Sequence, residues 1–112
     1  MSECIFCKII SKEAPAGIIY ENENILVFKD IAPKAPIHIL IIPKKHIPSI
    51  NHLELEDRAL VGELLLTAKR IAKEQGIAET GFRLVFDTGK DAGQTVEHLH
   101  LHLLGGARLP WA

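Results

Sequence analysis

Residues 98–104 read His-Leu-His-Leu-His-Leu-Leu, and this run constrains the fold more than any other stretch of the chain. Side chains of a β-strand point alternately to opposite faces, so a strand here separates three histidines from the leucines between them. The leucines then enter a hydrophobic core. We therefore predict a strand over His98–Leu104 that carries a row of imidazoles on its other face.

The spacing of these histidines indicates how they are used. With a rise of roughly 3.3 Å per residue, the Cα atoms of His98 and His102 lie about 13 Å apart, too far to converge easily on one zinc ion. An adjacent His-x-His pair could still share a metal. The row suits separate tasks along an extended ligand such as a phosphate ester, with one nucleophile and neighbouring proton or hydrogen-bond donors. The alternative is a solvated polar sheet face, or an accidental metal-binding tract.

Length and charge limit the possible functions. The chain has 112 residues, enough for a single domain over 1–112 with a modest core. A net charge of −1 gives no basic field, so broad nucleic-acid binding is not expected. The N-terminus lacks the basic and apolar segments of a signal peptide, and no run of about 18 apolar residues occurs. We therefore expect a soluble, cytoplasmic protein without a membrane partner.

The rest of the pattern predicts an α+β fold: a five-stranded antiparallel sheet with one long and one short helix. The short helix is expected at Ile5–Ser11. The long helix is expected within Leu53–Gln75, where apolar residues recur every three or four positions: Leu60, Val61, Leu64, Leu65, Ala68, Ile71 and Ala72. β-prone runs bounded by turn residues predict the other four strands: Ile18–Glu21, Ile25–Asp30, Ile37–Ile42 and Phe82–Phe86.

A loop over Asp87–Thr95 joins the last two strands and leads directly to the histidine row. Its glycines fit neither a Walker A motif nor a dinucleotide-binding fingerprint. Glycine does allow backbone N–H groups to approach an anion, and Gly93 lies beside the side-chain donors of Gln94 and Thr95. Taken alone, the loop is more typical of a plain hairpin turn. Its position next to three histidines favours a phosphate-binding element.

With these features, the sequence resembles the histidine triad (HIT) family. The signature His-φ-His-φ-His-φ-φ, where φ is apolar, is highly specific. Gly105-Gly106 and Trp111 resemble the histidine triad nucleotide-binding (Hint) branch rather than the branch that cleaves dinucleoside polyphosphates. The resemblance covers nearly the whole chain, from Cys4–Ile10 through Phe28–His38 and Ile42–His46 to the C-terminal end.

The resemblance implies a purine nucleoside phosphoramidase, which hydrolyses the P–N bond between a nucleoside 5′-monophosphate and an amine. It also implies a homodimer whose two sheets join into one. His100 would be the nucleophile that forms a nucleotidyl-histidine intermediate, and His102 and His38 would contact the phosphate and assist proton transfer. Asp30 would accept hydrogen bonds from the ribose. The other implied contacts are to the phosphate from Gln94 and Thr95, and to the base from Phe28, Ile31 and Leu40.

Elementary chemistry agrees with these roles. Imidazole is largely neutral near pH 7, so it can attack phosphorus without first losing a proton. A departing amine must be protonated, which requires a nearby acid that histidines can supply. A carboxylate such as Asp30 suits neutral sugar hydroxyls better than phosphate. The alternative for Asp30 is a turn residue before the Ala-Pro elbow.

The chain departs from the Hint pattern at Asp87, where that branch generally has an asparagine. An asparagine both donates and accepts hydrogen bonds. An ionised aspartate only accepts, and it repels a phosphate unless it is paired or protonated. The difference bears on substrate preference or catalytic efficiency. It also leaves open a second function, a purine nucleotide-binding adaptor or regulatory module with little turnover.

Cys4-x-x-Cys7 has the spacing of half a zinc site, and two imidazoles would have to come from elsewhere. Some bacterial relatives resemble this chain in that motif and bind zinc with histidines that correspond here to His46 and His98. A closed four-ligand site has no position for substrate, so the zinc would be structural and His98 would not be catalytic. His52 is an alternative ligand. Two further alternatives are metal-free cysteines that act as small hydrophobes, and a zinc domain whose histidines are all ligands.

Overall fold

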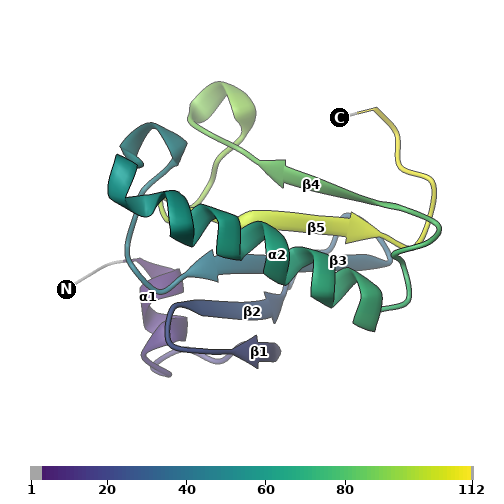
Figure 1. Cartoon of the computed structure of the whole chain (residues 1–112), viewed down its shortest axis with the longest axis horizontal. Helices are drawn as coiled ribbons and strands as arrows, with labels where there is room; N and C mark the ends of the chain where they lie inside the picture. The colour runs from purple at the N-terminus through teal and green to yellow at the C-terminus, as the bar shows by residue number, and fades with distance from the viewer. Residues whose placement is uncertain (1–3, 112) are drawn as a thin grey trace.

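The structure is a computed structural model that describes residues 4–111. Five antiparallel strands form one sheet in the spatial order β1-β2-β3-β5-β4 (Figure 1). The α+β fold with its antiparallel sheet is therefore confirmed. The strands are β1 (Ile18–Glu21), β2 (Ile25–Lys29), β3 (Ile37–Pro43), β4 (Phe82–Phe86) and β5 (Leu101–Gly105), and the helices are α1 (Ile5–Ile10) and α2 (Arg58–Glu74).

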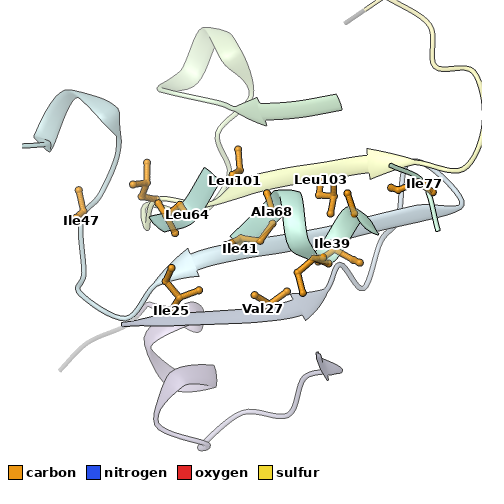
Figure 2. Packing of buried hydrophobic residues seen from close by; sticks show 13 residues of the cluster. Ile25, Val27, Ile39, Ile41, Ile47, Leu64, Ala68, Ile77, Leu101 and Leu103 are labelled. Atoms are coloured by element: carbon orange, nitrogen blue, oxygen red, sulfur yellow. The ribbon is translucent and has the colours of Figure 1, made fainter. Parts of the chain in front are cut away.

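The sheet has an apolar layer on each face. α2 lies across one face, and its residues Leu64 and Ala68 are fully buried there (Figures 1 and 2). Figure 2 shows the strand side chains of the same cluster, which include Ile25, Val27, Ile39, Ile41, Leu101 and Leu103. On the other face, two residues of α1 pack against alternate residues of β2 and β3: Phe6 and Ile9 against Leu26, Phe28, Leu40 and Ile42. The central strands are apolar on both sides because both faces are covered.

The long helix begins at Arg58, inside the predicted range Leu53–Gln75. A 3-10 turn over Leu55–Asp57 precedes it, and the side chains of Glu54 and Asp57 cap that turn reciprocally. The helix ends before Gly76, whose φ of 77° is the left-handed conformation that glycine adopts readily. Leu65 points outward and is 42% exposed, because it lies about 100° around the helix from the buried Leu64. Within residues 4–111, neither helix is long and apolar enough to cross a membrane.

The predicted strand over the histidine row is correct only in its second half. β5 begins at Leu101, so His98 and His100 precede the sheet ladder. The partner strand β3 ends at Pro43, which has no N–H for a further ladder bond, and the Pro43 carbonyl oxygen is 2.8 Å from Nε2 of His98. The alternation nevertheless holds, since Leu99, Leu101 and Leu103 all enter the core on the α2 side.

Candidate active site and metal centre

A cavity of about 1040 Å³ opens on the α1 side of the sheet. Its walls bring together residues from α1, from β2 and β3, from the loop before the histidine row, and from β5. Most of the predicted catalytic and nucleotide-contacting residues line it: Phe28, Asp30, Ile31, His38, Leu40, Asp87, Gly93, Thr95, His100 and His102. His98 is fully buried and belongs to a different group of side chains, described below.

His100 is held in one orientation by a main-chain group. Its Nδ1 lies 2.6 Å from the carbonyl oxygen of His98. A carbonyl only accepts hydrogen bonds, so Nδ1 carries the proton and the lone pair of the neutral ring is on Nε2. The ring of Phe6 packs edge-on against this imidazole, with centroids 5.1 Å apart at 89°. His100 thus offers a buried, oriented ring nitrogen that is suited to nucleophilic attack.

His38 and His102 form a hydrogen-bonded pair whose proton positions follow from their partners. The backbone N–H of Lys34 donates to Nδ1 of His38 at 3.0 Å, so the proton of neutral His38 is on Nε2. That Nε2 lies 2.9 Å from Nδ1 of His102 and donates to it. His102 therefore carries its own proton on Nε2, which faces Oδ2 of Asp87 at 3.5 Å. We call the set Asp30, His38, His102 and Asp87 the proton relay.

Burial determines the charge of this pair. Burial lowers the pKa of His102 to about 4, and the neighbouring His100 and His38 act in the same direction against Asp87 and Asp30. Burial also lowers the pKa of His38, although the adjacent Asp30 opposes the shift. Both rings are therefore neutral at pH 7. The relay presents a directed N–H at each step and no fixed positive charge.

Asp30 has the turn role considered from the sequence and also lines the cavity. Its Oδ1 accepts a hydrogen bond from the backbone N–H of Ala32 at 2.8 Å, which is the turn role. Its Oδ2 lies 3.4 Å from Nε2 of His38 at the cavity wall. The carboxylate is fixed by the first contact and remains beside the cavity through the second.

In the loop before the histidine row, two of the predicted phosphate donors make hydrogen bonds within the fold. Both amide protons of Gln94 are used within the fold, by the carbonyl oxygens of Pro48 at 2.7 Å and Val96 at 3.0 Å. The backbone N–H of Gly93 donates to Lys90 at 3.0 Å. Gln94 therefore braces the loop and does not line the cavity, and Gly93 lines it without a spare donor. Thr95 remains exposed at the wall.

Cys4, Cys7, His46 and His98 converge at the N-terminal end of α1, and we call them the metal cluster. Sγ of Cys4 is 3.4 Å from Nδ1 of His98, and Sγ of Cys7 is 3.3 Å from Nδ1 of His46. The two Nδ1 atoms are 3.1 Å apart. Tetrahedral zinc bonds of about 2.0 to 2.3 Å require ligand atoms roughly 3.3 to 3.8 Å apart, so these positions suit one zinc ion.

The protonation of His98 also suits a metal ligand. Its Nε2 donates to the carbonyl oxygen of Pro43, so Nδ1 carries the lone pair and points at the other ligands. Burial lowers the pKa of His98 to about 4, which keeps the ring neutral. Nitrogen and sulfur ligands in this number are typical of a closed structural zinc site.

The proton relay also contains potential ligands, because Asp30, His38 and His102 place N and O atoms within 4.8 Å of one another. Proton positions distinguish it from the metal cluster. The backbone N–H of Lys34 already donates to Nδ1 of His38, so Nε2 of the neutral ring must keep its proton. A metal there would require the Lys34 bond to break. The arrangement therefore favours proton transfer over metal binding.

The sequence reasoning passed over Phe6, which reaches both groups. Its ring centroid lies 5.1 Å from that of His100 and 5.9 Å from that of His98, and the side chain is 7% exposed. The feature of the sequence that could have indicated Phe6 was its position between two cysteines that were themselves candidate ligands. No feature of the sequence indicates the backbone groups that orient the histidines.

Comparison with known proteins identifies the family. The protein-family model described as "Scavenger mRNA decapping enzyme C-term binding" matches residues 3–108. A purine nucleoside phosphoramidase of Escherichia coli is 46% identical over 96% of this chain and 90% of its own length. A HIT family hydrolase from Legionella pneumophila is 50% identical, with a TM-score of 0.95 and 97% of each chain covered. The chain belongs to the histidine triad family.

One solved relative bears on the metal cluster. A Zn-bound histidine triad family protein from Mycobacterium smegmatis is 39% identical, with a TM-score of 0.78, over 91% of this chain and 73% of its own.

Proposed function

We propose that this protein hydrolyses the P–N bond of purine nucleoside 5′-phosphoramidates through a nucleotidyl intermediate on His100. The observation that carries the proposal is the bond from Nδ1–H of His100 to the carbonyl oxygen of His98, which leaves the Nε2 lone pair as the nucleophile at the cavity. The similarity to the Escherichia coli phosphoramidase supports this choice of substrate.

The reaction takes place in two balanced steps. Nε2 of His100 bonds to phosphorus, and the P–N bond breaks as the leaving nitrogen takes a proton from Nε2 of His102. A solvent proton that enters at Asp30 and passes through Nε2 of His38 to Nδ1 of His102 keeps that ring neutral. Water then attacks phosphorus, its proton returns to the relay, and the N–P bond to His100 breaks. The products are a nucleoside monophosphate and a free amine. His38 supports His102 by donating to its Nδ1, which orients the ring for both transfers.

The nucleotide lies along the cavity in an orientation that the wall residues favour. Asp30 accepts hydrogen bonds from the ribose, and Thr95 donates its hydroxyl to the phosphate. Asp87 lies at the phosphate end beside His102. The base packs among apolar side chains from three segments: Phe28, Ile31 and Leu40.

The metal cluster holds structural zinc in this proposal. Cys4, Cys7, His46 and His98 would supply all four ligands, so the zinc would link α1 to the segment before β5 and bind no substrate. The fitting ligand distances and the zinc-bound relative from Mycobacterium smegmatis support this.

We also propose a homodimer that extends the sheet through β4. Both β1 and β4 are edge strands, but the register of β1 is irregular between Ile18 and Tyr20, whereas β4 is regular and carries the partly exposed Phe82. Sedimentation velocity over a range of concentrations tests this. A dimer is expected, and a monomer throughout would contradict it.

The test of the enzyme function uses an adenosine phosphoramidate with a fluorescent amine. Wild type should release the amine, and His100→Ala should lose at least ~10³-fold in kcat while AMP affinity changes by less than about tenfold. Wild type quenched in an alkaline denaturant, in which the P–N bond of the intermediate is stable, should carry one adenylyl group on His100 by mass spectrometry. His52→Ala, outside the cavity, is the matched control. Tight AMP binding without turnover in wild type would instead support the nucleotide-binding adaptor.

A further inference from the structure

We propose that Phe6 and His98 transmit metal occupancy to the nucleophile, so that zinc in the metal cluster tightens nucleotide binding in the cavity. The inference rests on the proposed function only in that AMP serves as the ligand of the cavity. It assigns Phe6 as a positioning residue, since it acts through His100 and through the wall of the pocket.

The first link is α1 itself. Cys4 caps this helix and its Sγ accepts from the backbone N–H of Cys7 at 3.4 Å, so two metal ligands hold its first turn. A helix of six residues has little stability of its own, and its position depends on what it packs against. Its other attachments are apolar: Phe6 and Ile9 against the sheet. A bound ion would therefore add a large part of the forces that fix α1.

The second link is the ring of Phe6, a residue that lies between Cys4 and Cys7 in the sequence. It packs edge-on against His98 of the metal cluster, against His100, and against Phe28, with centroid distances of 5.9, 5.1 and 5.5 Å. Close-packed side chains transmit small displacements because there is no free volume to absorb them. A shift of α1 therefore moves the surface against which the nucleophile rests.

The third link is the backbone of His98. The same residue offers Nδ1 to the metal cluster and its carbonyl oxygen to Nδ1–H of His100. Fixing the His98 side chain on an ion fixes the carbonyl that orients the nucleophile. α1 also forms one wall of the cavity through Ile5, Phe6 and Ile9. Metal binding thus organises both the nucleophile and the pocket.

The experiment measures AMP affinity by calorimetry in zinc-loaded protein and in protein stripped with a chelator. Zinc should tighten AMP binding by about tenfold, and AMP should tighten zinc binding by the same factor in competition with a chromophoric chelator, because coupling between two sites is reciprocal. Circular dichroism and thermal melts confirm that both forms are folded at the temperature used. Equal AMP affinities within twofold in the two folded forms would overturn the inference.

Phe6→Leu tests the transmission, because it keeps apolar volume and all four metal ligands while it removes the ring. One zinc should still bind, but the effect of zinc on AMP affinity should fall to about twofold. Tyr20→Leu, on β1 and outside the cavity wall, is the matched loss of a ring and should keep the tenfold response. A full response in Phe6→Leu would remove the role assigned to Phe6.

A nucleotide-free measurement separates this inference from the proposed function. Two-bond ¹H–¹⁵N spectra of the histidine rings, assigned with His100→Ala, should show the His100 resonances shifting when zinc is added to stripped wild type. Shifts confined to His46 and His98 would contradict the coupling, even if AMP did not bind. Zinc-dependent His100 shifts in a protein that cleaves no phosphoramidate would overturn the proposed reaction and keep the coupling.

Discussion

The metal cluster and the proton relay both contain two imidazoles whose facing ring nitrogens lie about as close as a hydrogen bond allows, 3.1 Å in one and 2.9 Å in the other. They differ in the backbone group that contacts the other ring nitrogen of one histidine in each pair. A carbonyl oxygen, that of Pro43, faces His98, so the lone pair points into the cluster. A backbone N–H, that of Lys34, faces His38, so a proton points into the relay. One main-chain atom thus decides whether a histidine pair suits a metal or a proton.

Among changes that distinguish the metal cluster from the proton relay, the largest expected effect is on the metal cluster alone. His46→Gln removes one of four ligands at an exposed position, so zinc affinity should fall by roughly 10² to 10³-fold while the fold persists. Competition with a chromophoric chelator measures the affinity. His52→Gln provides the control, because His52 bonds to Ser49 and lies outside the cluster. An unchanged affinity in His46→Gln, or an equal loss in His52→Gln, would contradict the assigned ligand set.

A histidine-to-glutamine substitution in the proton relay should lower activity and leave zinc binding unchanged. His38→Gln removes the N–H that supports His102, so kcat for the phosphoramidate should fall by about 10²-fold, as expected for loss of an acid–base group. Zinc stoichiometry and affinity should stay at wild-type values. Weakened zinc binding in His38→Gln would mean that the relay also holds a metal, and that the Lys34 contact does not exclude one.

The sequence predicted which residues come together in the metal cluster and the proton relay better than it predicted the chemistry of each set. The alternation of leucine and histidine correctly separated the core from the polar face, because strand geometry depends only on local spacing. The protonation of each ring depends on backbone groups of Pro43, Lys34 and His98, which carry no side-chain signal.

Gln94 shows the same limit from the other direction. A glutamine beside a glycine-rich loop predicts an anion contact, yet its amide bridges the carbonyl groups of Pro48 and Val96. Pro48 is distant in sequence, and only the tertiary fold brings it to the loop. Partly buried backbone acceptors need donors, and the Gln94 amide satisfies two of them.

Acid should affect stability through the relay. The pKa of His102 is about 4 in the folded protein and about 6.5 when unfolded. The contribution of the neutral ring to the free energy of unfolding is therefore complete above pH 6.5 and is lost as pH falls towards 4. The free energy of unfolding falls by at most about 3 kcal/mol through this residue. Urea unfolding at pH 7 and pH 4.5 should therefore show a smaller acid loss in His102→Gln than in wild type. Equal losses would mean that His102 is not buried as a neutral ring.

The smallest expected effect concerns Asp87, where the chain departs from the family pattern. Asp87→Asn keeps an oxygen that faces Nε2–H of His102 but removes a negative charge at the phosphate end of the cavity. AMP should therefore bind about two- to fivefold more tightly at low salt, and the gain should shrink as salt screens the charge. Because Asp87 raises the pKa of His102 against the effect of burial, the acid limb of kcat/KM should move to lower pH, by less than about one unit.

Asp91→Asn removes an equal charge from the same loop outside the cavity wall and should change neither quantity. Weaker AMP binding in Asp87→Asn would mean that Asp87 contacts the nucleotide as an acceptor, and that it belongs with Asp30 at the sugar rather than with His102 at the phosphate.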